Sequence, residues 1–485
     1  MKKTNENANA HEHSLNHALE FFSKSGSLLE KRGSFYGEEA SAKDLFINSF
    51  ITDKLLTMRL AFWLRDCRGG AGNRSGFRSI IEWLGHNDPT WVKANMHLIP
   101  VHGRWDDLKS LFKTPLRNVA GSFWAKSIDG GDILAAKWAK RHYKPIREAL
   151  GLRESDFRKL LANLRKDHIV EHKMCQKQWN SIDYKKVPSV AMARYTRCFA
   201  KNDEERFTAY KEAVKSGQAT IKADVLFPHD CIRTALYGDA DTAELQFNAL
   251  PNFMEDSNER AIVICDTSGS METNVSGSVQ AIHVSMGMAL YCSSRMPKNS
   301  SFYKRFVAFC DEGKFVDWRD YTFKTAIRSK NVFDRAVGST RIDKALDTIL
   351  NIAVKRNIKQ ELMPTTLLII SDMQFTEGAV NLTKVIYSGK EKIKRKEENA
   401  LTEVERSLVK WDKAGYDRPK IVYWNTAGYS GQQDTVNSNN IGLVSGFSPS
   451  ILKAIFDGDD FSPLSIMYKA IEKYEIINPE MDIML

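Results

Sequence analysis

The sequence has few cysteines, and they form no recognisable metal or disulfide pattern. Its seven cysteines are scattered along 485 residues, and no two of them form a Cys-x-x-Cys pair. A structural zinc site or a disulfide framework would need closely spaced or paired cysteines. We therefore expect reduced thiols in a cytoplasmic protein.

Signals for export and for membrane attachment are also missing. No apolar run approaches the ~20 residues that a transmembrane helix needs. The N-terminal stretch MKKTNENANAHEHS has two lysines but no apolar segment after them, and a signal peptide requires such a segment. The sequence therefore predicts a soluble protein with no membrane partner.

The common enzyme motifs are not present either. The chain contains no Gly-Lys-Ser/Thr of a phosphate-binding P-loop, and DTSGSM at 266–271 is not the Gly-x-Ser-x-Gly of a serine hydrolase. A phosphatase of the haloacid dehalogenase type needs a second Asp two residues after Asp266, where this chain has Ser268. No nucleophile–base pair or paired catalytic carboxylates stand at supporting positions. We expect a protein that is not an enzyme.

What the chain does contain is an uneven distribution of charge. Residues 1–250 carry 40 Lys and Arg against 30 Asp and Glu, whereas residues 251–485 carry 30 of each kind. The formal charge of +10 therefore comes entirely from the first half. Such an asymmetry favours an acidic partner for that half, and charge alone leaves RNA, DNA and anionic membrane open.

The first half has the apolar period of helices. In ESDFRKLLANLRK the apolar residues Phe157, Leu160, Leu161 and Leu164 recur at i, i+3, i+4 and i+7. Many helices of this kind, separated by short breaks, predict an all-helical array of stacked, HEAT-like helix pairs over residues 14–250, although the sequence has no strict repeat period.

The pattern of apolar residues changes near residues 250–260. Five short apolar runs predict strands, at 261–265, 305–310, 365–371, 420–425 and 441–446. Helical segments are expected between them, near 276–296, 341–356, 396–413 and 449–457, and the charged run 389–399 is expected to be an exposed helix start. Alternation of strand and helix predicts a doubly wound, Rossmann-like α/β domain over residues 258–485.

Oxygen-bearing side chains stand at the ends of these predicted strands. Asp266, Ser268 and Ser270 follow the first strand, Asp372 follows the run 365–371, and Thr340 precedes a helix. In an open α/β sheet, ligands bind beyond the carboxyl ends of the strands. Two carboxylates and three hydroxyls suit Mg²⁺, Mn²⁺ or Ca²⁺ and disfavour zinc. The alternative is that Ser268 and Ser270 cap a helix starting near residue 276.

These motifs resemble a known family. DTSGS at 266–270, GST at 338–340 and IISD at 369–372 are similar to the metal-ion-dependent adhesion site of von Willebrand factor A domains. The resemblance implies metal ligands at Asp266, Ser268, Ser270, Thr340 and Asp372, and one coordination position left for a carboxylate of a protein partner.

The first half resembles another family. WLRDCRGGAGNRSGFRSIIEWL (63–84) is similar to the TROVE domain of the Ro autoantigen family, and the segments near 135–166 and 179–221 resemble a bacterial, plant and viral branch of that superfamily. The resemblance implies a helical ring closed by the A-type domain. It also implies binding of single-stranded ends of non-coding or misfolded RNA and of structured RNA, as a ribonucleoprotein component.

Closely spaced basic residues are the candidates for contacts with RNA phosphates. The candidates are Arg65, Arg68, Lys137, Lys140, Arg141, Lys144, Arg158, Lys159, Arg165 and Lys166, with Arg74, Arg78 and Arg147 in the same clusters. Two alternatives remain. In the first, Arg65 and Asp66 hold the RGGAG turn; in the second, the later clusters are solvated helix faces. The sequence thus predicts a Ro-like RNA-binding protein with a magnesium-dependent interaction site, or a metal-dependent protein scaffold with no nucleic-acid role.

Overall fold

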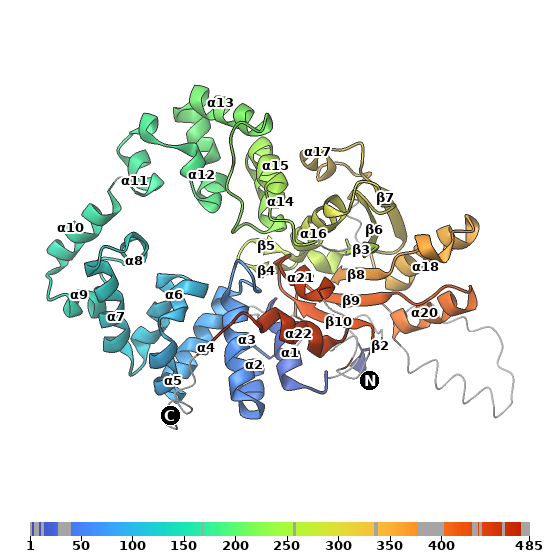
Figure 1. Cartoon of the computed structure of the whole chain (residues 1–485), viewed down its shortest axis with the longest axis horizontal. Coiled ribbons are helices and arrows are strands. Elements are labelled where there is room, and N and C mark those ends of the chain that lie inside the picture. Colours follow the sequence, from blue (N-terminus) through green and yellow to red (C-terminus); the bar gives the residue numbers. More distant parts are fainter. Residues whose placement is uncertain are drawn as a thin grey trace.

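The computed structural model describes residues 2–3, 9–10, 14–27, 40–166, 168–255, 259–333, 338–376, 402–428, 435, 439–457 and 461–476. Helices make up nearly all of the first half, and a mostly parallel sheet with its own helices makes up the second (Figure 1). This division agrees with the predicted combination of an all-helical region and an α/β region. The predicted helix start at 389–399 lies outside the described residues.

The helical half begins with a short pairing of β1 (Lys2–Lys3) with β2 (Asn9–Ala10). Its α-helices are α1 His17–Ser25, α2 Ala42–Thr52, α3 Lys54–Arg65, α4 Arg74–Asn87, α5 Pro89–Asn95, α6 Leu98–His102, α7 Arg117–Asp129, α8 Ile133–Trp138, α9 Lys144–Ala149, α10 Glu154–Arg165, α11 Val170–Cys175, α12 Ser189–Asn202, α13 Glu204–Lys215, α14 Pro228–Tyr237 and α15 Ala240–Asn248. Its 3₁₀ helices are η1 Trp105–Lys113, η2 Trp179–Ser181 and η3 Tyr184–Lys186.

The second half alternates strands and helices. Its strands are β3 Ala261–Asp266, β4 Asn274–Ser276, β5 Val279–Gln280, β6 Arg305–Phe309, β7 Gly313–Asp317, β8 Thr366–Ser371, β9 Lys420–Asn425 and β10 Ile441–Ser445. Its helices are η4 Gly269–Glu272, α16 Ala281–Arg295, α17 Phe323–Ala326, α18 Ile342–Lys355, η5 Gln360–Leu362, α20 Glu403–Lys413, α21 Ile451–Phe456 and α22 Pro463–Ile471.

The apolar stripes of the helices face the core, as their period predicts. In α10, Phe157 and Leu161 are buried, and Leu160 and Leu164 pack against the same cluster while partly exposed. In α3, the side chain of Asp53 accepts a hydrogen bond from the amide of Leu56 at 3.0 Å and so starts the helix. Helix stability here therefore comes from tertiary packing of one face, with caps defining the ends.

The central sheet has the strand order β10-β9-β8-β3-β6-β7. All neighbouring pairs are parallel except β6 with β7, which are antiparallel. From β3 the chain moves outward to β6 and β7, then returns to β8 on the other side of β3. The strand order therefore reverses between β3 and β8, which is where ligands bind in sheets of this kind.

Residues 274–280 differ from the prediction. They form the β4–β5 hairpin, and the helix expected from residue 276 begins only at Ala281. Neither Ser268 nor Ser270 caps that helix, because its N-cap residue is Gln280. The alternative reading of these two serines as caps of that helix is thus wrong. The antiparallel edge strand β7 was also not predicted.

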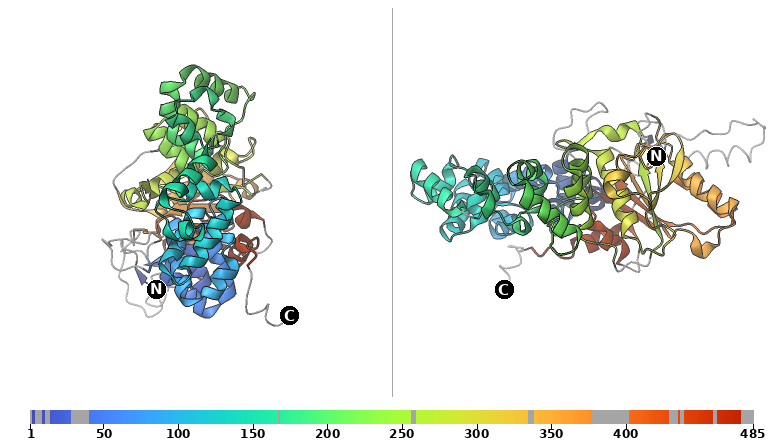
Figure 2. Two further views of the ribbon diagram at one scale, coloured as in Figure 1. Left: turned by 90° about the vertical axis from the view of Figure 1, so that its left-hand side faces the viewer. Right: turned by 90° about the horizontal axis from the view of Figure 1, so that it is seen from above.

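The helices form a closed circuit that leaves the sheet and returns to it. In Figure 1 they run from α1 through α7 and α10 to α15. The side views in Figure 2 show that the molecule is thinner than it is wide. The first part of the circuit shares one apolar core with the sheet, whereas α12 and α13 belong to a second core cluster. The two core clusters are joined through α11, which has no buried residue and therefore contributes little packing between them.

The first junction of the circuit joins α1 to the sheet. The hydroxyl of Ser445 in β10 donates to the carbonyl of Phe22 at 2.7 Å and accepts from the amide of Gly26 at 3.0 Å. The hydroxyl of Ser27 donates to the carbonyl of Asn425 at 2.6 Å. These bonds attach the N-terminal helix to strands more than 390 residues away.

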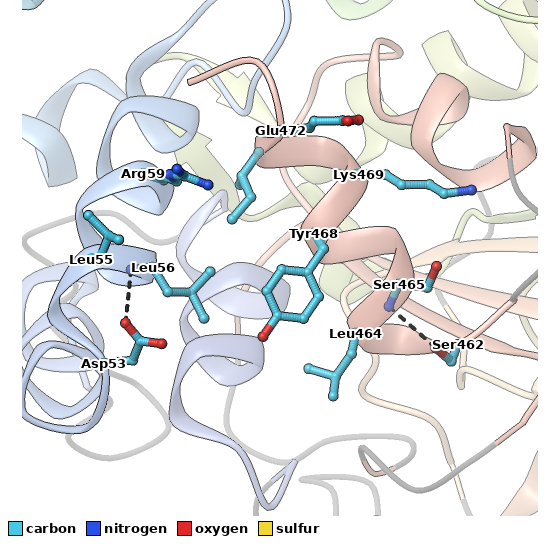
Figure 3. A pocket seen from close by; sticks show the side chains of 11 residues that line it. Asp53, Leu55, Leu56, Arg59, Ser462, Leu464, Ser465, Tyr468, Lys469 and Glu472 are labelled. Atoms are coloured by element: carbon cyan, nitrogen blue, oxygen red, sulfur yellow. Dashed lines mark hydrogen bonds between the residues drawn. The ribbon is translucent and has the colours of Figure 1, made fainter. Parts of the chain in front are cut away.

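The same junction continues along α3 and α22. The buried carboxylate of Asp66 accepts hydrogen bonds from Lys473 Nζ at 2.8 Å and from the Tyr474 hydroxyl at 2.9 Å. A groove of about 860 Å³ runs between the two helices. Figure 3 shows Leu55 and Leu56 of α3 on one side of this groove and Tyr468 of α22 facing them.

The second junction joins the end of the helical half to α16 and α17. The rings of Phe247 in α15 and Phe323 in α17 stack with their centroids 4.1 Å apart. Arg295 of α16 donates to the carbonyl of Phe247 at 2.9 Å, and Lys324 pairs with Asp241 at 2.6 Å. Because both ends of the helical half bind the α/β half, the two halves form one closed unit.

Candidate metal site and basic surfaces

The two predicted metal-binding carboxylates lie at the reversal point of the sheet. Asp266 is the last residue of β3, and Asp372 follows directly after β8. These strands are hydrogen-bonded parallel neighbours, with Cys265 opposite Ile370. Both carboxylates are fully buried. The topology therefore brings together two acidic residues that are 106 positions apart in the chain.

Hydrogen bonds hold the two strand-end loops in place. Asp266 Oδ1 accepts from the amide of Ser268 at 2.9 Å, and its Oδ2 accepts from the hydroxyl of Ser371 at 2.5 Å. Asp372 Oδ1 accepts from the amide of Gln374 at 3.1 Å. Each Asp thus shapes its own loop by bonding two residues ahead, and Ser371 connects the two loops.

Thr340 lies in a third loop that contacts the loop after β8. This loop precedes α18, and the Thr340 side chain is fully buried. The amide of Thr340 donates to the hydroxyl of Thr376 at 2.8 Å, and the amide of Thr376 donates to the carbonyl of Thr340 at 2.9 Å. The next amide, of Arg341, donates to the carbonyl of Cys310, the residue that follows β6.

The serines complete the group of oxygens. Ser268 is buried, Ser270 is half-buried, and their hydroxyl oxygens lie 3.1 Å apart. Hydrogen bonds therefore connect the three loops that carry the five predicted ligands. Ser371 and Thr376, which support the loops, were not predicted, although Ser371 stands directly before Asp372 in the IISD motif.

The electrostatics of this site favour a cation. Burial, together with the nearby charge of Asp372, raises the pKa of Asp266 well above its usual range. Two carboxylates that share a dry site repel each other unless a proton or a cation lies between them. Among the described residues no group of three or more His, Cys, Asp or Glu side chains gathers as a metal cluster. The donor set of two carboxylates and three hydroxyls fits a hard divalent ion.

The predicted RNA-binding residue Arg65 is inside the protein. It is 2% exposed, and its Nε donates to Asp107 Oδ2 at 2.7 Å. Asp66 is likewise buried, with Lys473 and Tyr474 as its partners. Both residues thus stabilise the structure around the RGGAG turn, as the structural alternative predicts. Among residues 67–70, Arg68 is the exposed one.

Arg165 also has structural contacts. Its guanidinium donates to the carbonyl of Ala136 at 2.8 Å and to that of Ala139 at 2.5 Å. It therefore fastens α10 to the end of α8. Burial lowers the pKa of this arginine from its ordinary value.

The remaining predicted RNA-binding residues divide into two groups. Three lie near carboxylates: Lys137 is 3.7 Å from Glu171, Arg141 is 3.9 Å from Glu154 and Lys144 is 3.4 Å from Glu148. The others are exposed, and no carboxylate of the described residues lies within ion-pair distance of them; they are Lys140, Arg158, Lys159 and Lys166. We name Lys140, Arg158, Lys159 and Lys166 the α8–α10 basic face.

The tertiary structure also brings arginines of the first linear cluster together with two arginines from other parts of the chain. Arg65 and Arg74 line a cavity of about 300 Å³ together with Arg104, which precedes η1, and Arg194 of α12. Arg104 and Arg194 were not predicted, because they are isolated in the sequence from the other basic residues of this group.

Two family models match parts of this chain. One, described as domain of unknown function DUF2828, matches residues 132–266, and the other, described as domain of unknown function DUF7788, matches residues 260–477. The chain is also similar to "Uncharacterized protein L728" of Acanthamoeba polyphaga mimivirus. The two proteins are 25% identical over 491 residues, which cover 88% of this chain and 81% of the viral protein.

A solved structure is also similar. The crystal structure of the Deinococcus radiodurans RO (RSR) protein superposes with a TM-score of 0.47 and 13% identity, covering 94% of this chain and 99% of that one. None of these similarities identifies a ligand of this chain. Within the described residues, no helix has the length and apolarity needed to cross a membrane.

Proposed function

We propose that this protein binds RNA through its helical half and holds a hard divalent cation in its α/β half. The observation that carries the RNA proposal is the charge excess of ten in residues 1–250, part of which lies on the unpaired α8–α10 basic face. Such a surface attracts phosphates without reading bases. The sequence resemblance to the Ro family supports single-stranded ends and structured non-coding RNA as ligands, within a ribonucleoprotein.

The RNA proposal is tested by the salt dependence of binding. Fluorescence anisotropy of a labelled single-stranded RNA is measured with the full-length protein at several salt concentrations. We expect affinity to fall by about 0.7 log units per log of salt for each phosphate contact, because binding releases counterions. Absence of binding at low salt would refute the proposal.

We further propose that Asp266, Ser268, Ser270, Thr340 and Asp372 hold Mg²⁺, with Mn²⁺ or Ca²⁺ as substitutes. The bound ion would neutralise the buried carboxylates and accept a carboxylate from a protein partner. The protein residues keep the three loops in register and exclude water from the site. This function is binding and needs no catalytic step.

The metal proposal is tested by thermal unfolding. The protein is first treated with EDTA and then supplied with Mg²⁺, Mn²⁺ or Ca²⁺. A cation that binds the folded state raises the unfolding midpoint. Identical midpoints with and without all three cations would refute this proposal and leave the RNA proposal intact.

A second candidate function is a metal-dependent protein scaffold with no nucleic-acid role. One observation favours it: Lys137, Arg141 and Lys144 lie near carboxylates, which weakens their electrostatic attraction for phosphates. Copurified nucleic acid, measured by the ratio of absorbance at 260 and 280 nm, separates the two candidates.

A further inference from the structure

The arginine-lined cavity lies where three parts of the molecule meet. Its wall includes the turn between α3 and α4, residues of α12 and α14, and the β4–β5 hairpin of the α/β half. Figure 1 places these elements around the middle of the helical circuit. The cavity volume of about 300 Å³ is at the lower end of the range for small-ligand sites. It suits one nucleotide or a smaller group.

Arg65 forms the inner wall of this cavity and has an unused donor. Its Nε is bonded to Asp107, but its Nη2 is buried and has no hydrogen-bond partner among the described residues. A buried donor left without an acceptor costs free energy. An acceptor in the cavity would satisfy it.

The nearby carboxylates already have partners. Asp107 accepts from Nε of both Arg65 and Arg78, at 2.7 Å each, and Asp106 accepts from Arg78 Nη2 at 2.8 Å and from the Tyr143 hydroxyl at 3.1 Å. Asp107 Oδ2 also accepts from the backbone amide of Arg104 at 2.9 Å. Among the described residues, neither aspartate forms an ion pair with the guanidinium of Arg74, Arg104 or Arg194. The negative charge close to Arg65 is therefore already shared between two guanidinium groups.

Three further arginines add positive charge at the cavity. Arg74, Arg104 and Arg194 have no ion-pair partner in the part of the chain that the structure describes. One carboxylate lines the cavity, that of Asp230, and its Oδ2 accepts from the amide of Phe227 at 3.0 Å. The described lining therefore carries four guanidinium groups against one carboxylate.

The positive charges of these arginines lie close enough to affect one another. Burial, with the charges of Arg74 and Arg65, lowers the pKa of Arg104 to about 10. The guanidinium of Arg104 also lies 4.9 Å from the centre of the Trp138 ring, which restrains it. The amino end of α4, a helix of 14 residues, opens on the cavity at Asn73 and Arg74 and adds its partial positive charge.

We propose that this cavity binds a phosphate monoester, namely the terminal phosphate of a single RNA strand. A monoester carries close to two negative charges at neutral pH, since its second pKa is about 6, whereas a phosphodiester within the strand carries one. Guanidinium groups bind such oxygens through paired hydrogen bonds. The cavity volume admits the end of a strand and not a length of it. This inference rests on the proposed RNA-binding function.

The test compares RNA strands that differ only at their ends. One single-stranded decamer is prepared with hydroxyls at both ends, with a 5′-phosphate, or with a 3′-phosphate, and binding to the full-length protein is measured by anisotropy in phosphate-free buffer. We expect one phosphorylated form to bind about tenfold tighter than the hydroxyl form, because a hydrogen bond between charged groups contributes enough free energy for a change in affinity of this size.

Two variants locate the effect. The double variant Arg74→Gln, Arg194→Gln changes two exposed arginines at the cavity and should abolish the preference for the phosphorylated end. The matched control Arg68→Gln changes an exposed arginine of the same turn that does not line the cavity, and it should keep the preference. Thermal unfolding of each variant confirms that both remain folded.

Other outcomes would overturn the inference. If wild-type protein binds all three strands equally, the cavity does not recognise an end phosphate, while the RNA-binding function stands. If RNA does not bind but inorganic phosphate raises the unfolding midpoint of wild type and not of the double variant, the ligand is a free phosphate. In that case both the end-recognition proposal and the RNA-binding proposal fail.

Discussion

The two halves of the molecule handle buried charge in opposite ways. In the helical half, Arg65 is buried beside a carboxylate of opposite sign, Asp107. In the α/β half, Asp266 is buried near Asp372, a charge of the same sign. The charge of Arg65 is balanced within the protein, although its Nη2 still lacks an acceptor, whereas the like-charged pair needs a proton or a cation. A buried pair of opposite charges therefore stabilises the fold in the helical half, whereas a buried pair of like charges prepares a binding site in the α/β half.

The largest effect is expected from breaking the buried pair of Arg65 and Asp107 in the helical half. Asp107→Asn removes the charge that Arg65 and Arg78 share, and breaking a buried ion pair costs about 3–5 kcal/mol. We expect the free energy of unfolding, measured by urea denaturation, to fall by an amount in this range. As a control, Asp317→Asn removes an exposed-surface partner of Arg305 and Arg319 and should cost less than ~1 kcal/mol. Equal losses for both variants would contradict the comparison.

The next effect concerns the exposed charges of the helical half. Replacing the α8–α10 basic face, Lys140, Arg158, Lys159 and Lys166, by Glu should weaken RNA binding roughly 100-fold at low salt and reduce the salt slope by about three. The loss should be similar for unrelated RNA sequences, because phosphates carry no sequence information. Anisotropy titrations at several salt concentrations measure both quantities.

A matched variant in the α/β half controls for net charge. Lys298, Lys355, Arg356 and Lys413 are exposed, and their replacement by Glu changes the total charge by the same amount. This variant should bind RNA within about threefold of wild type, if the contacts are local. An equal loss in both variants would show that overall charge, and not the α8–α10 basic face, attracts RNA.

The third effect tests the like-charge pair. In EDTA, Asp372→Asn should leave the free energy of unfolding unchanged or raise it, since it removes repulsion with Asp266. In Mg²⁺ at about 30 times its dissociation constant, wild type should gain about 2 kcal/mol, from the binding of ligand to the folded state alone. The variant should gain much less. A strong loss of stability in EDTA would contradict the opposed roles of charge in the two halves.

The smallest effect concerns the paired lysines of the helical half. Lys137→Gln with Lys144→Gln should weaken RNA binding less than about threefold, because both lysines already lie near carboxylates and contribute little to phosphate binding. The same anisotropy assay measures this, with Lys140→Gln and Lys159→Gln as the unpaired comparison. A larger loss for the paired lysines would reverse the assignment of the RNA-binding surface.

Prediction from sequence succeeded best where local pattern is enough. Five predicted strands correspond to β3, β6, β8, β9 and β10, because continuous apolar runs suit a sheet buried on both faces. The strand β7 escaped prediction, since its pattern at an exposed edge is short and mixed. The helix expected from residue 276 starts five residues later, because residues 274–280 pair as a hairpin instead.

The candidate sites were predictable to different degrees. Asp266, Ser268 and Ser270 share one loop, and Asp372 ends another apolar run, so their positions at strand ends follow from the sequence. The role of Ser371 as the donor to Asp266 depends on the pairing of β3 with β8 and appears only in the structure. Linear clusters of basic residues were a weaker guide, since Arg65 and Arg165 are held by internal contacts.

The sequence by itself determined the alternation of elements, the charge excess of the first half and the oxygen-bearing side chains at the strand ends. These features depend on local periodicity and on composition, which tertiary contacts do not alter. Only the tertiary structure decided which basic side chains remain free and which arginines share a cavity. Arg65 and Arg74 flank one turn, and Arg104 and Arg194 come from two other segments of the helical half. They meet because both ends of that half pack against the same sheet domain.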